Sequence, residues 1–148
     1  MKTSAGILMY RDTPAGRGVL LVHPGGPFWA KKDDGAWSIP KGEFSEGEDP
    51  LTAARREFAE ELGAAVDGEF VALPVIRQKG GKVVHAWAVR GEFDVAKLKS
   101  NTFEMEWPPK SRTMRSFPEV DRAAWFDLDT ARRKILPSQS ALLDGLPG

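Results

Sequence analysis

The chain has 148 residues, of which 41% are hydrophobic and 28% are charged, as is typical of a globular protein with a sizeable core. Basic and acidic residues are equal at 21 each, so the charge balance favours neither nucleic acid nor membrane as a partner. The absence of cysteine excludes disulfides, thiolate metal sites and thiol nucleophiles. The first residues lack a signal-peptide pattern and no apolar run is long enough to span a membrane. We therefore expect a single domain, residues 1–148, in the cytoplasm.

The first third of the chain predicts a strand hairpin followed by loops. Apolar runs at 5–11 and 18–24 are bounded by Gly, Pro and Asp and predict two strands, joined across the segment DTPAGRG. Residues 24–37 are rich in turn formers and predict a loop. A brief strand and a long irregular turn are expected over 37–50.

Helical spacing begins after residue 49. Asp49 is a favourable N-cap and Pro50 fits the first helical position. Gly63 can end the helix. Between these signals, apolar residues recur at helical spacing, at Leu51, Ala54, Phe58 and Leu62. The pattern predicts a helix over about 50–62.

The rest of the chain alternates again between strand-like and helical segments. Strands are expected at 69–78 and 82–93, with the turn KGGK between them. Residues 94–107 are ambiguous, 108–121 predict a loop, and 122–129 predict a last strand. Residues 129–146 suggest a helix interrupted at Pro137. Strands interleaved with two helical segments predict a mixed α/β domain.

Three carboxylates crowd one face of the predicted helix. At about 100° per residue, Glu57, Glu60 and Glu61 share an arc beside the core stripe. No basic residue follows any of them by three or four positions, so the usual helical ion pairs are missing. One interpretation is a solvated acidic face screened by Arg55 or Arg56. The other is a site for a hard divalent cation such as Mg²⁺ or Mn²⁺, which prefers oxygen ligands.

The residues around this cluster carry a longer motif, from Gly42 to Ala64. It reads Gly42, five residues, Glu48, seven residues, and then REFAEELGA, with glycine at position 63. This segment resembles the Nudix box, the signature of the Nudix hydrolase superfamily. Only Ala64 departs from the pattern, because a bulkier aliphatic residue is usual there. The resemblance implies an α/β/α sandwich with a mixed central sheet.

The resemblance also implies a reaction and a metal site. Nudix enzymes use divalent metals to hydrolyse nucleoside diphosphates linked to another group. The implied metal-binding set is Glu57, Glu60 and Glu61, joined by the backbone carbonyl of Gly42. The implied cofactor is Mg²⁺ or Mn²⁺, and the implied role of Arg56 is to orient a glutamate.

Further roles follow from the same resemblance. Glu48 is expected to brace the loop, through Arg56. The general base differs between Nudix branches, and we expect it to be Glu57 or a carboxylate outside the box. Glu119 is the first such candidate, since an acid about six residues before the tryptophan of the last core strand commonly reaches the metals. The other candidates outside the box are Glu104 and Glu106.

The run WSIPKG, residues 37–42, is similar to one in diadenosine polyphosphate hydrolases. A lysine beside a metal cluster can hold an additional phosphate, so Lys41 favours a dinucleoside polyphosphate such as diadenosine tetraphosphate. Alternatively, Lys41 is simply solvated. The tyrosine that stacks on adenine in that subfamily has no counterpart here, because the only tyrosine is Tyr10. Aromatic residues that could stack on a base, although each type is more often found in a core, are Phe28, Trp29, Trp87 and Trp107.

A basic segment precedes Glu119. Arg112 and Arg115, together with Lys110, could close over the substrate phosphates. Two alternative functions stay open at this point: a pyrophosphohydrolase of single, possibly oxidised, nucleoside triphosphates, and a nucleotide-binding module without activity. The expected partner is a small nucleotide rather than a nucleic acid, bound by a monomer or homodimer.

Overall fold

The computed structural model describes residues 3–148, and for residue 79 only the backbone. Within these residues, seven strands form one mixed sheet. β1 and β6 are parallel, and the other pairs are antiparallel. The main order is β4 (Val71–Ala72), β6 (Val83–Arg90), β1 (Thr3–Thr13), β2 (Gly16–Pro24) and β9 (Val120–Asp127). β3 (Lys41–Glu43) pairs with β1, and β5 (Ile76–Arg77) pairs with β6.

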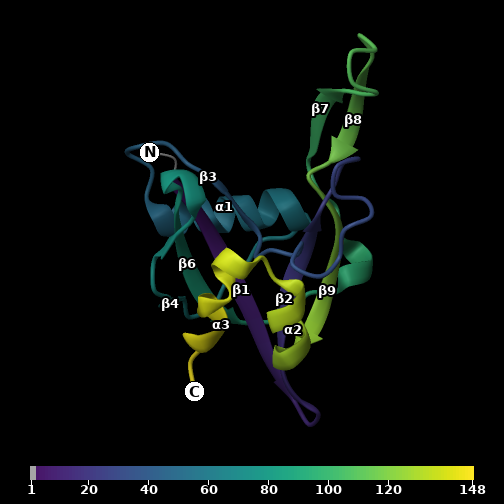
Figure 1. Ribbon diagram of the computed structural model, residues 1–148. Coiled ribbons are helices and arrows are strands. Elements are labelled where there is room, and N and C mark those ends of the chain that lie inside the picture. The colour runs from purple at the N-terminus through teal and green to yellow at the C-terminus, as the bar shows by residue number, and fades with distance from the viewer. Residues whose placement is uncertain (1–2) are drawn as a thin grey trace.

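Helices cover both faces of this sheet. Helix α1 (Pro50–Leu62) lies on one face, and α2 (Leu128–Lys134) and α3 (Ala141–Asp144) lie on the other (Figure 1). Along β1, Ile7 and Met9 belong to the apolar cluster that contains α1. Their neighbours Leu8 and Tyr10 belong to the cluster that contains α2 and α3. Because successive strand residues point to opposite faces, one apolar strand serves both cores.

Helix α1 has the bounds that its sequence predicts. The Asp49 side chain accepts a hydrogen bond from the Thr52 backbone N–H at 3.0 Å, and Pro50 takes the first position. Gly63 ends the helix in the left-handed region, at φ 80°. An added Cβ there would lie 2.6 Å from the Lys99 carbonyl oxygen, so the position requires glycine for space as well as conformation.

Several expected elements are confirmed, and others differ. The β1–β2 hairpin, β6, the last strand β9 and the interrupted helix at the carboxyl end are present. The single strand expected over 69–78 is instead two short strands, β4 and β5, on either side of Pro74. Proline cannot donate to a strand ladder, which accounts for the break.

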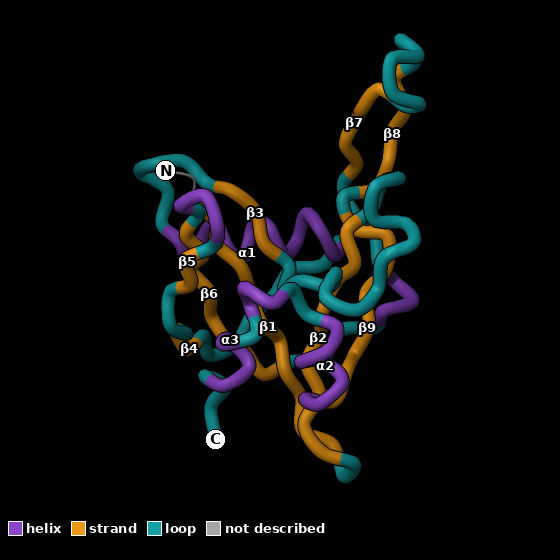
Figure 2. The backbone as a smooth tube through the Cα atoms, viewed as in Figure 1, coloured by secondary structure: helices purple, strands orange, loops and turns teal. Residues whose placement is uncertain are grey.

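The prediction of a loop over 108–121 is also wrong in part, because residues 114–118 form a strand, β8 (Met114–Pro118). This strand pairs with β7 (Thr102–Glu106) as a separate two-stranded sheet. This hairpin, called the β7–β8 arm below, projects from the body of the molecule (Figures 1 and 2). Among the described residues, no helix has the length and apolar character needed to cross a bilayer.

Candidate functional site

A polar pocket of about 370 Å³ lies between β3, α1 and the two ends of the β7–β8 arm. α1 turns three carboxylates toward it, those predicted from helical spacing. The arm contributes the residues at its base. The lining residues are Lys41, Gly42, Glu43, Glu57, Glu60, Glu61, Asn101, Thr102 and Glu119. We call this the acidic pocket.

Gly42 lets the backbone of β3 lie against α1. A Cβ added at Gly42 would come within 2.1 Å of the Glu57 carboxylate, so no other residue fits without moving that side chain. Pairing of Gly42 with Ala5 of β1 fixes its strand. The carboxylate of Glu57 therefore lies directly over the backbone at Gly42, where the motif predicts that a carbonyl and a carboxylate act together.

Arg56 connects the acids of the pocket to the loop before α1. Its guanidinium donates to both oxygens of Glu48, at 3.0 and 3.1 Å. The same group donates to Glu57 at 2.9 Å and to Glu60 at 3.3 Å. The ion pair with Arg56 lowers the pKa of Glu48. One arginine thus fixes the loop and two of the three glutamates, which are the contacts that the motif led us to expect of Arg56 and Glu48.

The remaining glutamate has no such partner among the described residues. Burial, together with the negative charge of Glu57, raises the pKa of Glu61 to about 8. The charge and backbone of Lys41 offset part of this rise. Burial also raises the pKa of Glu57, although Arg56 opposes it. Negative charge in this pocket is therefore under-compensated by the protein itself.

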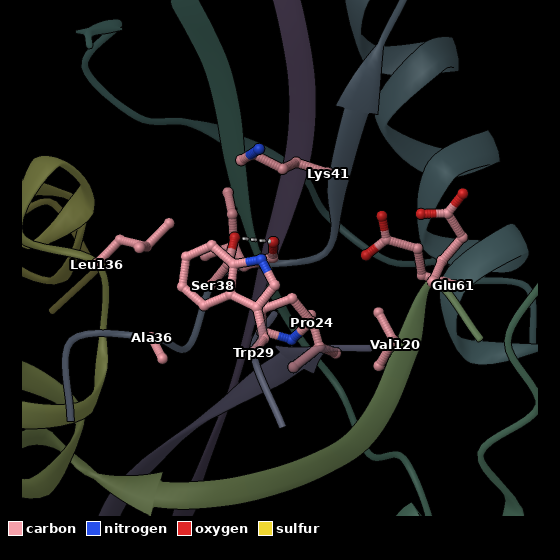
Figure 3. A pocket seen from close by; sticks show the side chains of 11 residues that line it. Pro24, Trp29, Ala36, Ser38, Lys41, Glu61, Val120 and Leu136 are labelled. Carbon is pink, nitrogen blue, oxygen red and sulfur yellow. Dashed lines mark hydrogen bonds between the residues drawn. The ribbon is translucent and has the colours of Figure 1, made fainter. Parts of the chain in front are cut away.

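A second pocket of about 260 Å³ adjoins the acidic pocket and shares Lys41, Glu61 and Glu119 with it. We call it the Trp29 pocket. The indole of Trp29 lies between Leu136 on one side and Glu61 on the other, with Lys41 reaching over it from β3 (Figure 3). Its walls are otherwise apolar or small. A charged pocket and a stacking surface thus meet at the three shared residues.

The loop that carries Trp29 is held at both ends. Buried His23 contacts the Lys32 carbonyl oxygen at 2.6 Å through Nε2 and Asp121 at 2.8 Å through Nδ1. The ammonium group of Lys32 lies 5.0 Å from the centre of the Trp29 ring. The Gly25 backbone N–H donates to the Glu119 carbonyl oxygen at 3.0 Å. These contacts fix the loop against β9 and beside Glu119.

Other predicted residues lie elsewhere. The basic residues Lys110, Arg112 and Arg115 are on the β7–β8 arm and line neither pocket. The alternative acids Glu104 and Glu106 are on β7 and also line neither. Asn101 and Thr102 line the acidic pocket but were not predicted. They fall in the segment 94–107, whose pattern indicated no element and carried no motif.

The acidic pocket has donors suited to a hard divalent cation, but they are not arranged as a finished metal cage. Among residues 3–148, no group of three or more Asp, Glu or His side chains could hold a metal ion as it stands. Arg56 holds Glu57 and Glu60 through ion pairs at the edge of this pocket. The close approach of Glu57 to Gly42 and the buried carboxyl group of Glu61, whose charge Lys41 offsets only in part, both fit a cation. Ligation by these residues stays a prediction.

Comparisons with known proteins identify similar chains. A family model for the NUDIX domain matches residues 1–145. The RNA pyrophosphohydrolase of Rhodospirillum rubrum is 32% identical over 144 residues, covering 90% of this chain and 82% of that protein. That of Caulobacter vibrioides is 45% identical over 51 residues, or 31% of this chain and 30% of that protein.

Solved structures share the fold at lower identity. An Ap4A hydrolase of C. elegans, solved as a binary complex, has a TM-score of 0.65 and 21% identity, covering 95% of this chain and 92% of that chain. The NUDIX domain of Shewanella oneidensis NrtR, solved with ADP ribose, has a TM-score of 0.64 and 15% identity, with coverages of 97% and 84%. These similarities show the expected α/β/α sandwich.

Proposed function

The chain belongs to the NUDIX family as a pyrophosphohydrolase, and we propose that it hydrolyses a dinucleoside polyphosphate such as diadenosine tetraphosphate. The observation that carries this proposal is the position of Lys41, which lines both the acidic pocket and the Trp29 pocket. A phosphate chain extending from one pocket to the other would pass this ammonium group. A dinucleotide has both the long phosphate chain and a base for Trp29.

The family generally uses divalent metal ions, and the acidic pocket is where we propose that one binds. The proposed ligands are Glu57, Glu60 and Glu61 with the Gly42 carbonyl. When bound, a divalent cation neutralises phosphate charge and lowers the pKa of an attacking water. Mg²⁺ and Mn²⁺ are the ions we expect, since the donors are all oxygens.

The other residues position the substrate and its phosphates. Arg56 restrains two glutamates through its hydrogen bonds, so that they do not turn away from the pocket. Lys41 binds a phosphate oxygen as a point charge. Trp29 provides a flat face for a base, because base–aromatic stacking tolerates every base.

The proton of the attacking water goes to a carboxylate. Glu57 remains our first candidate, and its pKa is raised by burial, which makes it a stronger base than a solvated glutamate. Glu119 is the rival. It is exposed and lines both pockets, and its carboxylate makes no hydrogen bond or ion pair within residues 3–148.

The triphosphorylated 5′ end of an RNA is a second candidate substrate. The observation in its favour is the 32% identity to an RNA pyrophosphohydrolase over 90% of the chain. Such an end also presents a chain of phosphates followed by a base, so it would use the same two pockets. The two candidates differ in what lies beyond the first nucleoside.

The test is hydrolysis with product identification by the Glu60→Gln/Glu61→Gln variant beside the wild-type protein, with Mg²⁺ or Mn²⁺ present. We expect wild-type cleavage of diadenosine tetraphosphate and a loss of about 10³-fold or more in the variant, since metal and phosphate stabilisation is usually the largest catalytic contribution. Glu69→Gln is the matched control, because Glu69 is exposed and outside both pockets.

The products separate the candidates. Mononucleotides from diadenosine tetraphosphate support the first substrate, and release of pyrophosphate from RNA ends supports the second. Pyrophosphate from free nucleoside triphosphates alone would replace both with a nucleotide-pool enzyme. Full activity in the double variant would overturn the role proposed for the acidic pocket.

A further inference from the structure

The β7–β8 arm has two chemically different faces. Residues directly opposite each other in an antiparallel pair project to the same face. Phe103 pairs with Phe117 and Met105 pairs with Arg115, so these four residues share one face. The alternate positions of β7, Glu104 and Glu106, project to the other face. The two acids of β7 are thus separated from the aromatic residues and from Arg115.

The first face continues into the loop that carries Trp29. An added Cβ at Gly26 would lie 3.0 Å from the Phe103 ring, so the loop packs along the arm. Phe28 meets Trp107 edge to face, with ring centres 5.5 Å apart. Phe28 remains 60% exposed despite this contact. Since Trp29 lines the second pocket, a run of aromatic side chains leads from that pocket onto the arm, with Phe28 exposed and the others partly buried.

The outer part of the arm carries three basic side chains, and the Glu106 carboxylate there accepts a hydrogen bond from the Lys110 backbone N–H at 2.8 Å. Lys110, Arg112 and Arg115 are all exposed, and none makes an ion pair within the described part of the chain. Lys110 and Arg112 both have positive φ, at 62° and 61°. This conformation is uncommon outside glycine, so the tip keeps an unfavourable backbone around its cations. In a chain of zero net charge, these three cations outnumber the two acids of the arm, Glu104 and Glu106, and leave it with a positive excess.

Exposed aromatic rings beside unpaired cations are the usual surface for single-stranded nucleic acid. We propose that the β7–β8 arm and Phe28 bind the RNA that follows the 5′-terminal nucleotide. Phe28 and Trp107 stack on a base, and Arg112 and Arg115 bind backbone phosphates. The inference rests on the second candidate substrate, because only an RNA continues beyond the nucleoside in the Trp29 pocket. The arm is then the feature that distinguishes a polynucleotide from a dinucleotide.

The first experiment measures binding without catalysis. The probe is a fluorescein-labelled oligoribonucleotide with a 5′-hydroxyl end, titrated with the full chain in EDTA over a series of salt concentrations. Its affinity is expected to fall about tenfold or more in Arg112→Ala/Arg115→Ala, and the slope of log affinity against log salt to decrease by about 1.4, for two phosphate contacts. Phe28→Ala is expected to weaken binding about tenfold at an unchanged slope, because it removes stacking only.

The matched control is Arg77→Ala/Lys82→Ala, which also removes two exposed cations. Arg77 is on β5, at the opposite end of the sheet from the arm (Figure 2). This control variant should bind RNA as the wild type does, and all variants should keep the wild-type melting temperature. Equal loss in this control, unchanged binding in the arm variant, or no binding by the wild type would each overturn the proposal.

The second experiment separates this inference from the proposed function. kcat/KM for a triphosphate-ended RNA is expected to fall in the arm variant by the same factor as affinity. If the wild type hydrolyses that RNA and the arm variant does so equally well, the arm proposal fails and the RNA activity stands. If the 5′-hydroxyl oligonucleotide binds through the arm but the triphosphate-ended RNA is not cleaved, the RNA substrate fails and the arm remains an RNA-binding surface.

Discussion

Glu61 is the residue at which burial and charge oppose each other most strongly. It lines both pockets, and burial beside Glu57 raises its pKa from 4.5 to about 8. Its neighbours Glu57 and Glu60 on α1 share Arg56, whereas Glu61 is compensated in part by the charge and the backbone hydrogen bond of Lys41. A carboxylate held this way is costly to ionise without a cation beside it. The crowding of Glu57, Glu60 and Glu61 in the sequence therefore corresponds to an energetic cost of ionising Glu61.

That pKa predicts how stability depends on pH in the metal-free protein. Because the folded-state pKa of Glu61 is above the unfolded value, the folded protein binds this proton more tightly. The resulting stability is fully present below about pH 4.5 and is lost as pH rises through about 8. In EDTA, the free energy of unfolding of the wild type should therefore fall more steeply over this range than that of Glu61→Gln. Urea denaturation at a series of pH values measures this.

The control for this prediction is Glu69→Gln, an exposed glutamate that should leave the wild-type pH profile unchanged. Parallel profiles for wild type and Glu61→Gln would show that the Glu61 carboxyl group does not titrate abnormally. Addition of Mg²⁺ should stabilise the wild type more than Glu61→Gln at high pH, since only the wild type has the ionised carboxylate to bind it.

At the scale of elements, α1 matters most because it carries Glu57, Glu60 and Glu61, the three acids of the Nudix box that line the acidic pocket. Its start is determined by local chemistry: Asp49 caps the helix through Thr52, and Pro50 suits the first turn. Its end is determined jointly by the left-handed conformation of Gly63 and by the space beside Lys99. These local signals explain why the predicted and observed bounds of α1 agree.

The cap gives a prediction for this element. Asp49→Ala should lower the free energy of unfolding by about 1 kcal/mol, because it leaves the Thr52 backbone N–H without its side-chain acceptor. Asp49→Asn retains an acceptor oxygen and should cost only a small part of that. Chemical denaturation at neutral pH would compare them. Equal stability of Asp49→Ala and wild type would mean that solvent caps the helix as well as Asp49 does.

The β7–β8 arm shows where local signals fail. Residues 108–113 contain the prolines and polar residues that are typical of a turn. The sequence therefore predicts a loop, and the predicted loop continues to residue 121. β8 is a strand because β7 pairs with it, from Thr102 opposite Pro118 to Glu106 opposite Met114. Strand formation depends strongly on such partners and weakly on intrinsic preference. The segment alone therefore could not indicate the hairpin.

At the scale of the whole molecule, the carboxyl end of the chain holds the run that precedes the Nudix box. Buried Gln139 accepts a hydrogen bond from the Ile39 backbone N–H at 3.0 Å and donates to the Ser38 hydroxyl at 3.0 Å. Lys41 follows two residues later. Contact between segments 100 residues apart therefore helps to hold the run that leads to Lys41, which also pairs with Gly6 of β1.

Gln139→Leu tests this connection. It should lower the free energy of unfolding by about 1–3 kcal/mol, because the buried Ile39 N–H loses its acceptor. It should also raise KM for nucleotides through displacement of Lys41. The control is Ser138→Ala, next to it but exposed, which should change stability by less than about 0.5 kcal/mol. Wild-type stability and KM in Gln139→Leu would show that the run holds its position without this anchor.

The total charge of the chain does not predict where charged side chains gather on the folded molecule. An even balance of 21 basic and 21 acidic residues favoured a small nucleotide over a nucleic acid as partner, and that prediction is untested. The balance is a sum over the chain and carries no information about position. Pairing of β7 with β8 is what separates Arg115 from Glu104 and Glu106. A local basic surface can therefore exist on a neutral protein.

The sequence by itself determined the family, the bounds of α1 and the set of acids that gather on it. These depend on residues close together in the chain, where helical spacing, capping and a motif of 23 residues have direct physical meaning. Only the tertiary structure decided that Lys41 lies between two pockets, that Trp29 faces one of them, and that Arg112 and Arg115 stand on an arm. Those positions depend on pairing and packing between segments far apart in the chain, which no local pattern encodes.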